Sequence, residues 1–241
     1  MSKNQHGLSR NIPEDIKQEI RKKYGFGCII CGLGIYEYEH IDPEFKDARE
    51  HDPTKITLLC SQCHSKKTRK FINKETIIEK MKAPINLTSG FVNEFLDINL
   101  ESHIIIEIGD AKFANCNVPI RFKNQNLIKI EKPTDGSKNY ILSCEFTDRT
   151  GLNTLKIINN EWITNSDSWD IIAKAGQLII KNEDEVYLII ENKNNNTLFI
   201  KYFKTVIQGY DVEISENGLK INNAMLKLFS VSNCNIGIDC P

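Results

Sequence analysis

The order of apolar and polar residues predicts a helix near the start of the chain and a mixed unit after it. Four apolar residues recur at helical spacing, with Gly25 placed to end the helix: Ile12, Ile16, Ile20 and Tyr24. Two short strands are then expected over residues 35–41 and 55–59, where β-branched or aromatic residues gather. Asp42-Pro43 directly follows the first strand and is expected to end it.

Two more helices are expected after the second strand. Ser61 is placed to cap a helix over about residues 63–72, and Asn73 is placed to cap one over residues 74–82. These elements follow one another closely, so we treat residues 1–84 as one domain.

The pattern changes beyond residue 84. Residues 85–102 are expected to form a connector, with a short helix over 91–96. In residues 103–241, short apolar runs alternate with turns rich in Asn, Gly, Asp and Lys, at intervals typical of an antiparallel sandwich or barrel. The predicted fold class is therefore α+β, an N-terminal mixed domain followed by an all-β C-terminal domain.

Two Cys-x-x-Cys pairs indicate the chemistry of the first domain. Such pairs supply thiolates at the spacing of a tetrahedral zinc site, and four sulfur ligands leave no open position for water. The predicted structural zinc ligands are Cys28, Cys31, Cys60 and Cys63. A polar segment of this size is not expected to fold without the metal. The alternative, four reduced core cysteines, does not require two matching pairs.

The segment that contains the cysteine pairs also contains one glutamate, two histidines and several basic residues that are candidates for chemistry. Glu39 and His40 stand near the end of the first predicted strand, and His64 directly follows the last cysteine of the pairs. Zinc ribbons usually have about 15–20 residues between their pairs, whereas residues 32–59 separate them here. Three basic residues further along the helix suit phosphate contacts or, alternatively, form a solvated face: Lys67, Arg69 and Lys70.

The two cysteine pairs, Glu39-His40 and His64, in this order, resemble the HNH endonuclease family over roughly residues 9–74. The resemblance implies a ββα-metal fold, in which a two-stranded ribbon and a helix hold a catalytic ion beside a structural zinc. It implies that His40 is the general base that activates water, and that Glu39 and His64 bind Mg²⁺ or Mn²⁺. For Glu39 the alternative is a solvated strand residue, and for His64 a place in the zinc site.

The chain departs from the family pattern at one position. The family's middle residue, usually an Asn that braces the loop bearing the base, falls at Lys55. Something else must therefore hold this loop, and His51 or Asp52 could contribute; His51 could alternatively bind the metal. The departure keeps open a second class of function, a zinc-dependent nucleic-acid-binding module without catalysis.

Composition and charge set few further limits. The net charge is −1, but residues 1–84 have an excess of Lys and Arg and the remainder an excess of Asp and Glu. The acidic remainder is a poor general clamp for DNA. No apolar run approaches the length of a membrane span, the N-terminus lacks an apolar signal core, and the other four cysteines are scattered. We therefore expect a reduced, cytoplasmic protein with no membrane partner.

The predicted function is a metal-dependent endonuclease that hydrolyses double-stranded DNA, with Zn²⁺ as structural cofactor and Mg²⁺ or Mn²⁺ as catalytic cofactor. Cleavage of both strands would need two active sites and hence a homodimer. The β-rich domain contains no catalytic set, so we expect it to sense a small molecule, modified DNA or a protein, or to serve specificity or assembly. Trp162 and Trp169 are expected in its core, with base stacking as the alternative. Two-part chains of this kind suit prokaryotic restriction or anti-phage defence.

Overall fold

The structure, a computed structural model, describes residues 3–95, 104–132, 140–150, 153–166, 170–174, 176–182, 185–194 and 196–241. Two compact units are present. The first consists of Met1–Glu94 with Asn165–Ile171, and the second of Phe95–Thr164 with Ile172–Pro241. Helices occur only before residue 90 of the described chain and strands dominate the rest, so the predicted α+β class is confirmed.

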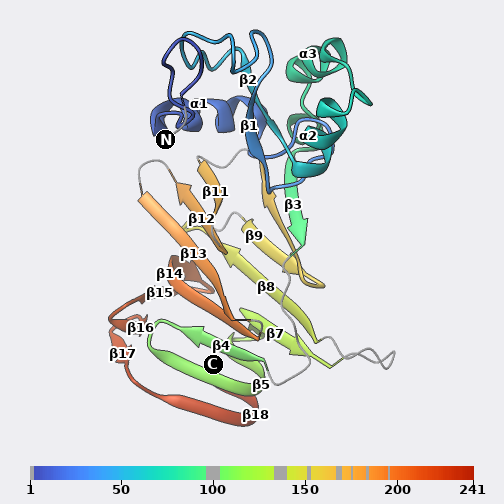
Figure 1. Cartoon of the computed structure of the whole chain (residues 1–241). Helices are drawn as coiled ribbons and strands as arrows, with labels where there is room; N and C mark the ends of the chain where they lie inside the picture. Colours follow the sequence, from blue (N-terminus) through green and yellow to red (C-terminus); the bar gives the residue numbers. More distant parts are fainter. Residues whose placement is uncertain are drawn as a thin grey trace. The chain divides into compact units, whose positions relative to one another are not determined.

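The first unit contains four helices and a two-stranded hairpin. Its elements are α1 (Glu14–Tyr24), β1 (Glu37–His40), β2 (Ile56–Leu59), α2 (Ser61–Thr68), α3 (Lys74–Lys82), α4 (Ile85–Ser89) and most of β3 (Phe91–Phe95). In Figure 1, α1 lies on one side of the hairpin and α2 on the other.

Helix α1 forms as predicted and buries the apolar residues that recur at helical spacing in the sequence. Ile20 and Tyr24 are fully buried, and Ile12 and Ile16 belong to or pack against the same core cluster. Gly25 takes a left-handed conformation with φ 68°, and its N–H donates to Arg21 O, as expected of a helix-ending glycine.

Asn73 caps α3 as predicted, since its side chain accepts from Thr76 N at 2.7 Å. The prediction that Ser61 caps α2 is wrong, because the cap is Cys60, whose sulfur accepts from Cys63 N at 3.4 Å. The helix also ends at Thr68, earlier than expected. Lys70 lies in the left-handed region with φ 63°, which a continuing helix cannot include.

The helix expected over 91–96 is also wrong, because residues 91–95 form strand β3. Gly90, with φ 80°, ends α4 immediately before it. The backbone of Asn93 then bridges in parallel to Leu33, and Asn93 O accepts from Gly34 N at 3.0 Å. A strand satisfies these backbone groups, and Val92 becomes fully buried.

A distant part of the sequence completes the first unit. Asp170 is fully buried and accepts two hydrogen bonds from Arg21, Nε to Oδ1 at 2.8 Å and Nη2 to Oδ2 at 2.9 Å. Arg21 Nη1 also donates to Tyr38 Oη at 2.9 Å. Burial acts to lower the pKa of Arg21, but the hydrogen bond to Asp170 and the interactions with Tyr38 and the Asp170 charge together outweigh it, so the pKa of Arg21 is raised. The two-point contact is the geometry in which an arginine best satisfies a carboxylate.

Replacing Asp170 by Asn is expected to destabilise the first unit by about 3–5 kcal/mol, because the buried guanidinium of Arg21 then loses its buried counterion and keeps only the exposed Glu14, whose Oε1 lies 2.9 Å from Arg21 Nη2. Hydrogen exchange of the α1 amides reports this local loss. The doubly substituted R21M/D170N chain should recover part of the loss, because neither partner is left as a lone buried charge. Equal protection of α1 in D170N and the unmodified chain would contradict the expectation.

The second unit is built from strands. These are β4 (Ile105–Ile108), β5 (Ala111–Phe122), β6 (Gln125–Asn126), β7 (Ile128–Glu131), β8 (Ile141–Thr147), β9 (Asn153–Ile158), β10 (Glu161–Asn165), β11 (Asp170–Lys174), β12 (Gln177–Asn182), β13 (Glu185–Asn194), β14 (Thr197–Ile207), β15 (Tyr210–Ser215), β16 (Gly218–Ile221), β17 (Ala224–Leu226) and β18 (Ser230–Cys240). Two of them, β10 and β11, extend into the Asn165–Ile171 segment of the first unit.

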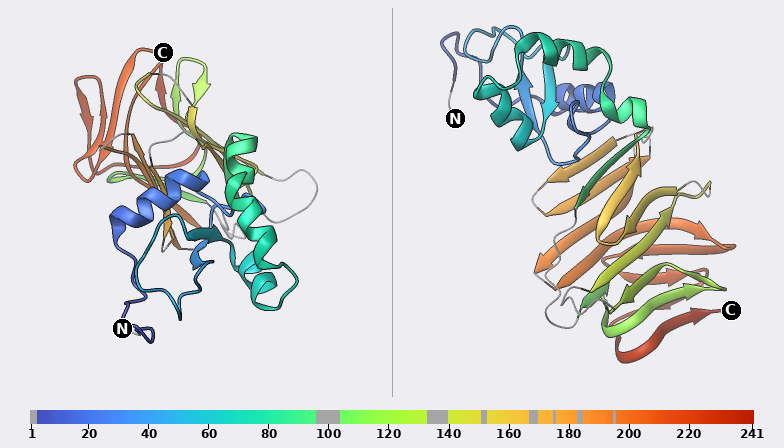
Figure 2. Two further views of the ribbon diagram at one scale, coloured as in Figure 1. Left: turned by 90° about the horizontal axis from the view of Figure 1, so that it is seen from above. Right: turned by 90° about the vertical axis from the view of Figure 1, so that its right-hand side faces the viewer.

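The strands form two sheets. One contains the antiparallel series β10-β9-β8-β7, and the other the series β11-β12-β13-β14-β15-β16-β17. From β14 the second sheet branches through β4 to β5, and β5 pairs in parallel with β18 (Figure 2). Phe146 and Phe203 meet edge to face between the sheets, with ring centroids 5.0 Å apart. The described strands form no closed ring, so the sandwich alternative describes this unit better than the barrel.

The predicted core placement of Trp162 is confirmed, since Trp162 is 4% exposed, whereas Trp169 lies outside the described residues. Strands β13 and β14 pair antiparallel up to Asn194 and Thr197. Every helix in the described residues is too short or too polar to cross a membrane.

Candidate nuclease site and zinc centre

The hairpin presents the two candidate residues of β1 in different directions. Glu39 pairs with Thr57 and His40 with Ile56 in an antiparallel register. Successive side chains of a strand point to opposite faces. The strand ends at His40, just before Asp42-Pro43, as predicted. Glu39 and His40 therefore have different neighbours.

The four predicted zinc ligands lie together. Their sulfur atoms are within 4.8 Å of one another, and all four cysteines are free thiols. Cys31 Sγ is 3.5 Å from Cys60 Sγ and 3.8 Å from Cys63 Sγ. Zn–S bonds of about 2.3 Å in a tetrahedron separate the sulfurs by about 3.8 Å. The donor set and its spacing therefore fit Zn²⁺.

Tight turns bring the first cysteine pair to the cluster. Gly32 has φ 85° and donates its N–H to Cys28 O at 2.9 Å, while Cys28 N donates to Leu33 O. The hydrogen bond between the Cys28 and Cys31 side chains lowers the pKa of Cys28 to about 5. At neutral pH this sulfur is therefore ready to bind a metal as thiolate.

Glu39 meets the helix that follows the zinc centre. His64, in the first turn of α2, has its Nε2 3.2 Å from Glu39 Oε2, and Lys67 Nζ lies 2.5 Å from Glu39 Oε1. The same helix face carries both partners, because they are three residues apart. Among the described residues, no third His, Cys, Asp or Glu joins Glu39 and His64 in a ligand cluster. Two donors about 3 Å apart suit neighbouring positions of an octahedral Mg²⁺ or Mn²⁺, whose other positions remain for water and phosphate.

His40 is held by different partners. Its Nε2 lies 3.2 Å from His51 Nδ1, and its ring packs edge to face on Phe45 with centroids 5.3 Å apart. His40 is 6% exposed. Burial lowers the pKa of His40 to about 4, and the neighbouring His51 adds to the effect. The imidazole is therefore neutral at physiological pH, the form in which it can accept a proton.

The loop over residues 41–55 surrounds a cavity of about 220 Å³ next to His40. The lining includes Asp47, Asp52 and Lys55 from this loop. Lys55 lies where the family pattern has Asn, and its Nζ pairs with Asp52 at 3.2 Å while its carbonyl accepts from Ile41 N. Asp52 also accepts from Thr54, so both residues stabilise the loop locally.

The loop beside His40 is held partly by Asn4, a residue that the sequence analysis did not identify. Asn4 Nδ2 donates to Phe45 O and Ala48 O, both at 2.6 Å. Asn4 thus holds the loop beside His40. No spacing or motif marks this residue, because its partners are backbone carbonyls about 40 positions away.

The three predicted phosphate contacts differ in their surroundings. Lys67 is engaged with Glu39, whereas Arg69 and Lys70 are exposed at the end of α2. Among the described residues, neither Arg69 nor Lys70 has a side-chain partner, and Lys74 pairs with Asp42 at 2.6 Å. The free cations are thus those just beyond the helix that carries His64.

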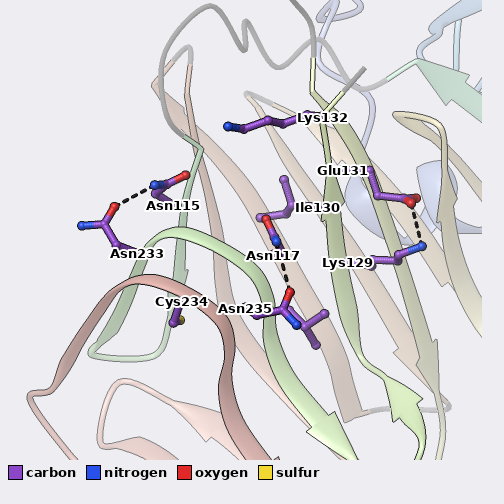
Figure 3. A pocket seen from close by; sticks show the side chains of 10 residues that line it. Asn115, Asn117, Lys129, Ile130, Glu131, Lys132, Asn233, Cys234 and Asn235 are labelled. Carbon is purple, nitrogen blue, oxygen red and sulfur yellow. Dashed lines mark hydrogen bonds and ion pairs between the residues drawn. The ribbon is translucent and has the colours of Figure 1, made fainter. Parts of the chain in front are cut away.

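The strand-rich unit contains a separate polar pocket of about 660 Å³ (Figure 3). Two asparagine pairs bridge β5 and β18 at its wall: Asn115 Nδ2 donates to Asn233 Oδ1 at 2.7 Å, and Asn117 Nδ2 to Asn235 Oδ1 at 3.1 Å. On β7, Lys129 pairs with Glu131 at 2.7 Å, while Lys132 also lines the pocket. Lys132 has no side-chain partner in the described chain.

An antiparallel hairpin, a following helix and four clustered cysteines suited to zinc together form a ββα unit. Residues 28–70 match the family HNH endonuclease, so the chain carries an HNH endonuclease domain. No curated protein and no solved structure matches the chain. The matched segment includes the four cysteines and all three predicted catalytic residues.

The geometry thus brings Glu39 and His64 together and gives His40 its own neighbours. His51 contacts His40, whereas from the sequence we considered it as a support of the loop or as a metal ligand. Arg21 and Asp170 were not indicated as partners, because 148 intervening residues separate them in the sequence. A buried arginine in a helix is the signal that could have prompted a search for an acid.

Proposed function

We propose that the chain is a metal-dependent HNH endonuclease that hydrolyses phosphodiester bonds of DNA. The observation that carries the proposal is the contact of Glu39 with His64 across β1 and α2, inside the HNH match and beside a cysteine cluster suited to Zn²⁺. Glu39 and His64 would hold Mg²⁺ or Mn²⁺. When bound, such a cation offsets the charge that develops on the phosphate and the departing oxygen.

In this proposal, His40 is the general base. If its Nε2 carries the proton and donates to His51 Nδ1, the lone pair of His40 Nδ1 is left to accept a proton from water. His51 would then fix the tautomer and the ring orientation of His40. The water oxygen would attack phosphorus as His40 takes its proton, the bond to the 3′-oxygen would break, and the departing oxygen would take a proton from solvent, which gives a 5′-phosphate and a 3′-hydroxyl.

The cations at the end of α2 would bind the phosphate backbone. Arg69 and Lys70 are exposed and follow His64 by five and six residues. Phosphate contacts of this kind give affinity without sequence preference and weaken steeply with added salt. Double-stranded DNA is the expected substrate, and cutting both strands would require two copies of the site.

The test is plasmid cleavage by the full chain in Mg²⁺ or Mn²⁺, compared with E39Q. Glutamine keeps the size of Glu39 but removes the charge that a hard cation requires. We expect E39Q to cleave at least 100-fold more slowly while binding DNA with similar affinity. Salt-sensitive DNA binding without cleavage in any divalent metal would instead support the alternative, a non-catalytic nucleic-acid-binding module.

The pocket in the strand-rich unit favours a second element of function, control by a ligand. We propose that a polar small molecule with an anionic group binds between the asparagine pairs and Lys132, because amides offer both donors and acceptors and the lysine offers a charge. Such control would suit a prokaryotic restriction or defence effector. Cleavage that starts only when a ligand or modified DNA is added would support this role, and full activity without either would oppose it.

A further inference from the structure

Lys67 occupies one oxygen of the proposed metal-binding carboxylate. Its Nζ is 2.5 Å from Glu39 Oε1, while His64 faces Oε2 at 3.2 Å. The side chains of Lys67 and Glu39 are 16% and 21% exposed. Water therefore screens this ion pair less than it screens a typical surface pair, and the carboxylate has a cationic partner in the absence of metal.

A divalent cation and the Lys67 ammonium compete for the same carboxylate. The ammonium neutralises Glu39 and would repel a cation held by Glu39 and His64. Lysine is a point charge on a flexible stem and can change partner by rotation of its side chain. Arg69 and Lys70, two and three residues further along, are free and exposed, so a DNA phosphate bound there would offer Lys67 an alternative anion.

We propose that Lys67 is a positioning residue that couples metal binding to DNA binding. Without DNA it holds Glu39 and weakens cation binding; with DNA it transfers to a phosphate and releases Glu39 for the cation. This inference rests on the proposed function, since it takes Glu39 and His64 as the cation site. Coupling is reciprocal, so the cation must raise DNA affinity by the same factor by which DNA raises cation affinity.

The experiment measures Mn²⁺ affinity of the zinc-loaded full-length chain by titration calorimetry, with and without a duplex that carries a non-hydrolysable linkage. The variants are K67Q and K66Q. Lys66 is an exposed neighbour on the same helix, so K66Q removes the same charge without touching Glu39. We expect K67Q to bind Mn²⁺ about tenfold more tightly than the unmodified chain in the absence of DNA, and K66Q to change affinity less than twofold.

DNA should raise Mn²⁺ affinity about tenfold in the unmodified chain and in K66Q, but much less in K67Q. Equal Mn²⁺ affinity of K67Q and the unmodified chain without DNA would overturn the coupling and leave the cation site intact. If no Mn²⁺ binds to the zinc-loaded chain, or if E39Q binds it equally well, the cation site itself fails and the proposed function with it.

Discussion

Replacing His40 by Ala is expected to lower the rate of DNA cleavage by about 10²–10⁴-fold, the usual contribution of a general base. The residue is the buried, neutral imidazole of the unit and faces the cavity formed by the loop after β1. DNA affinity and zinc content should be unchanged, because the free cations and the cysteines lie elsewhere. Cleavage under single-turnover conditions is the measurement.

Two controls separate chemistry from folding. His6 is exposed, so H6A makes the same substitution away from the site and should retain full activity. H40Q keeps most of the side-chain volume that packs on Phe45 but cannot act as a base near neutral pH. Activity of H40Q close to that of the unmodified chain would contradict the assignment of His40.

The pH profile gives an independent reading of the same residue. An ordinary histidine, with pKa near 6.5, would be only about one-tenth neutral at pH 5.5. The pKa of His40 is lowered to about 4, chiefly by burial, so nearly all of it remains neutral at that pH. With Mn²⁺ kept saturating, the cleavage rate is therefore expected to stay nearly constant from pH 7.5 to 5.5. A fall centred near pH 6.5 would show that the base is not the buried His40.

Removal of zinc is expected to unfold the first unit while the strand-rich unit remains folded. Cys28, Cys60 and Cys63 are buried in the same core as Ile20 and Tyr24, so the thiols stand where an apolar core would otherwise be needed. Structural zinc contributes about 10–16 kcal/mol in small zinc domains, more than the stability of a typical domain. Hydrogen exchange with and without a chelator reports each unit separately.

A matched pair of substitutions tests the same point without a chelator. C63S removes one proposed ligand, whereas C240S removes a partly exposed cysteine outside the cluster. Elemental analysis should find about one zinc per chain in C240S and clearly less in C63S. A full zinc content in C63S would show that Cys63 is not a ligand, and the absence of zinc from both C240S and the unmodified chain would show that the cysteines only pack.

Local patterns predicted the first unit well because its signals lie close together in the sequence. The apolar face of α1, the glycine that ends this helix and the cap on α3 each depend on residues within one or two helical turns of each other, and all three are present. The two cysteine pairs identified the cluster because metal geometry demands that spacing. The contact between Glu39 and His64 followed from the family resemblance, and periodicity alone would not have indicated it.

The predictions that failed concern segments and residues whose contact partners lie far away in the sequence. No strand was predicted over residues 230–240, although Cys234, Ile236, Ile238 and Cys240 stand at alternate positions; strand β18 forms there by parallel pairing with the distant β5. The helix expected at 91–96 became a strand through contact with Leu33. Asn4 and Asp170 act through contacts that only the folded chain creates. Contacts between residues distant in the sequence thus determined structure that local propensity did not predict.

Asp170 lies far beyond Arg21 in the sequence, so the ribosome synthesises it much later. Translation proceeds at about 5–20 residues per second, and the start of the chain can begin to fold while the rest is still being made. Asp170, the buried counterion of Arg21, is therefore synthesised roughly ten seconds or more after Arg21. By then most of the polypeptide has been made. The first unit can therefore form its buried Arg21–Asp170 ion pair only after much of the strand-rich unit has been synthesised.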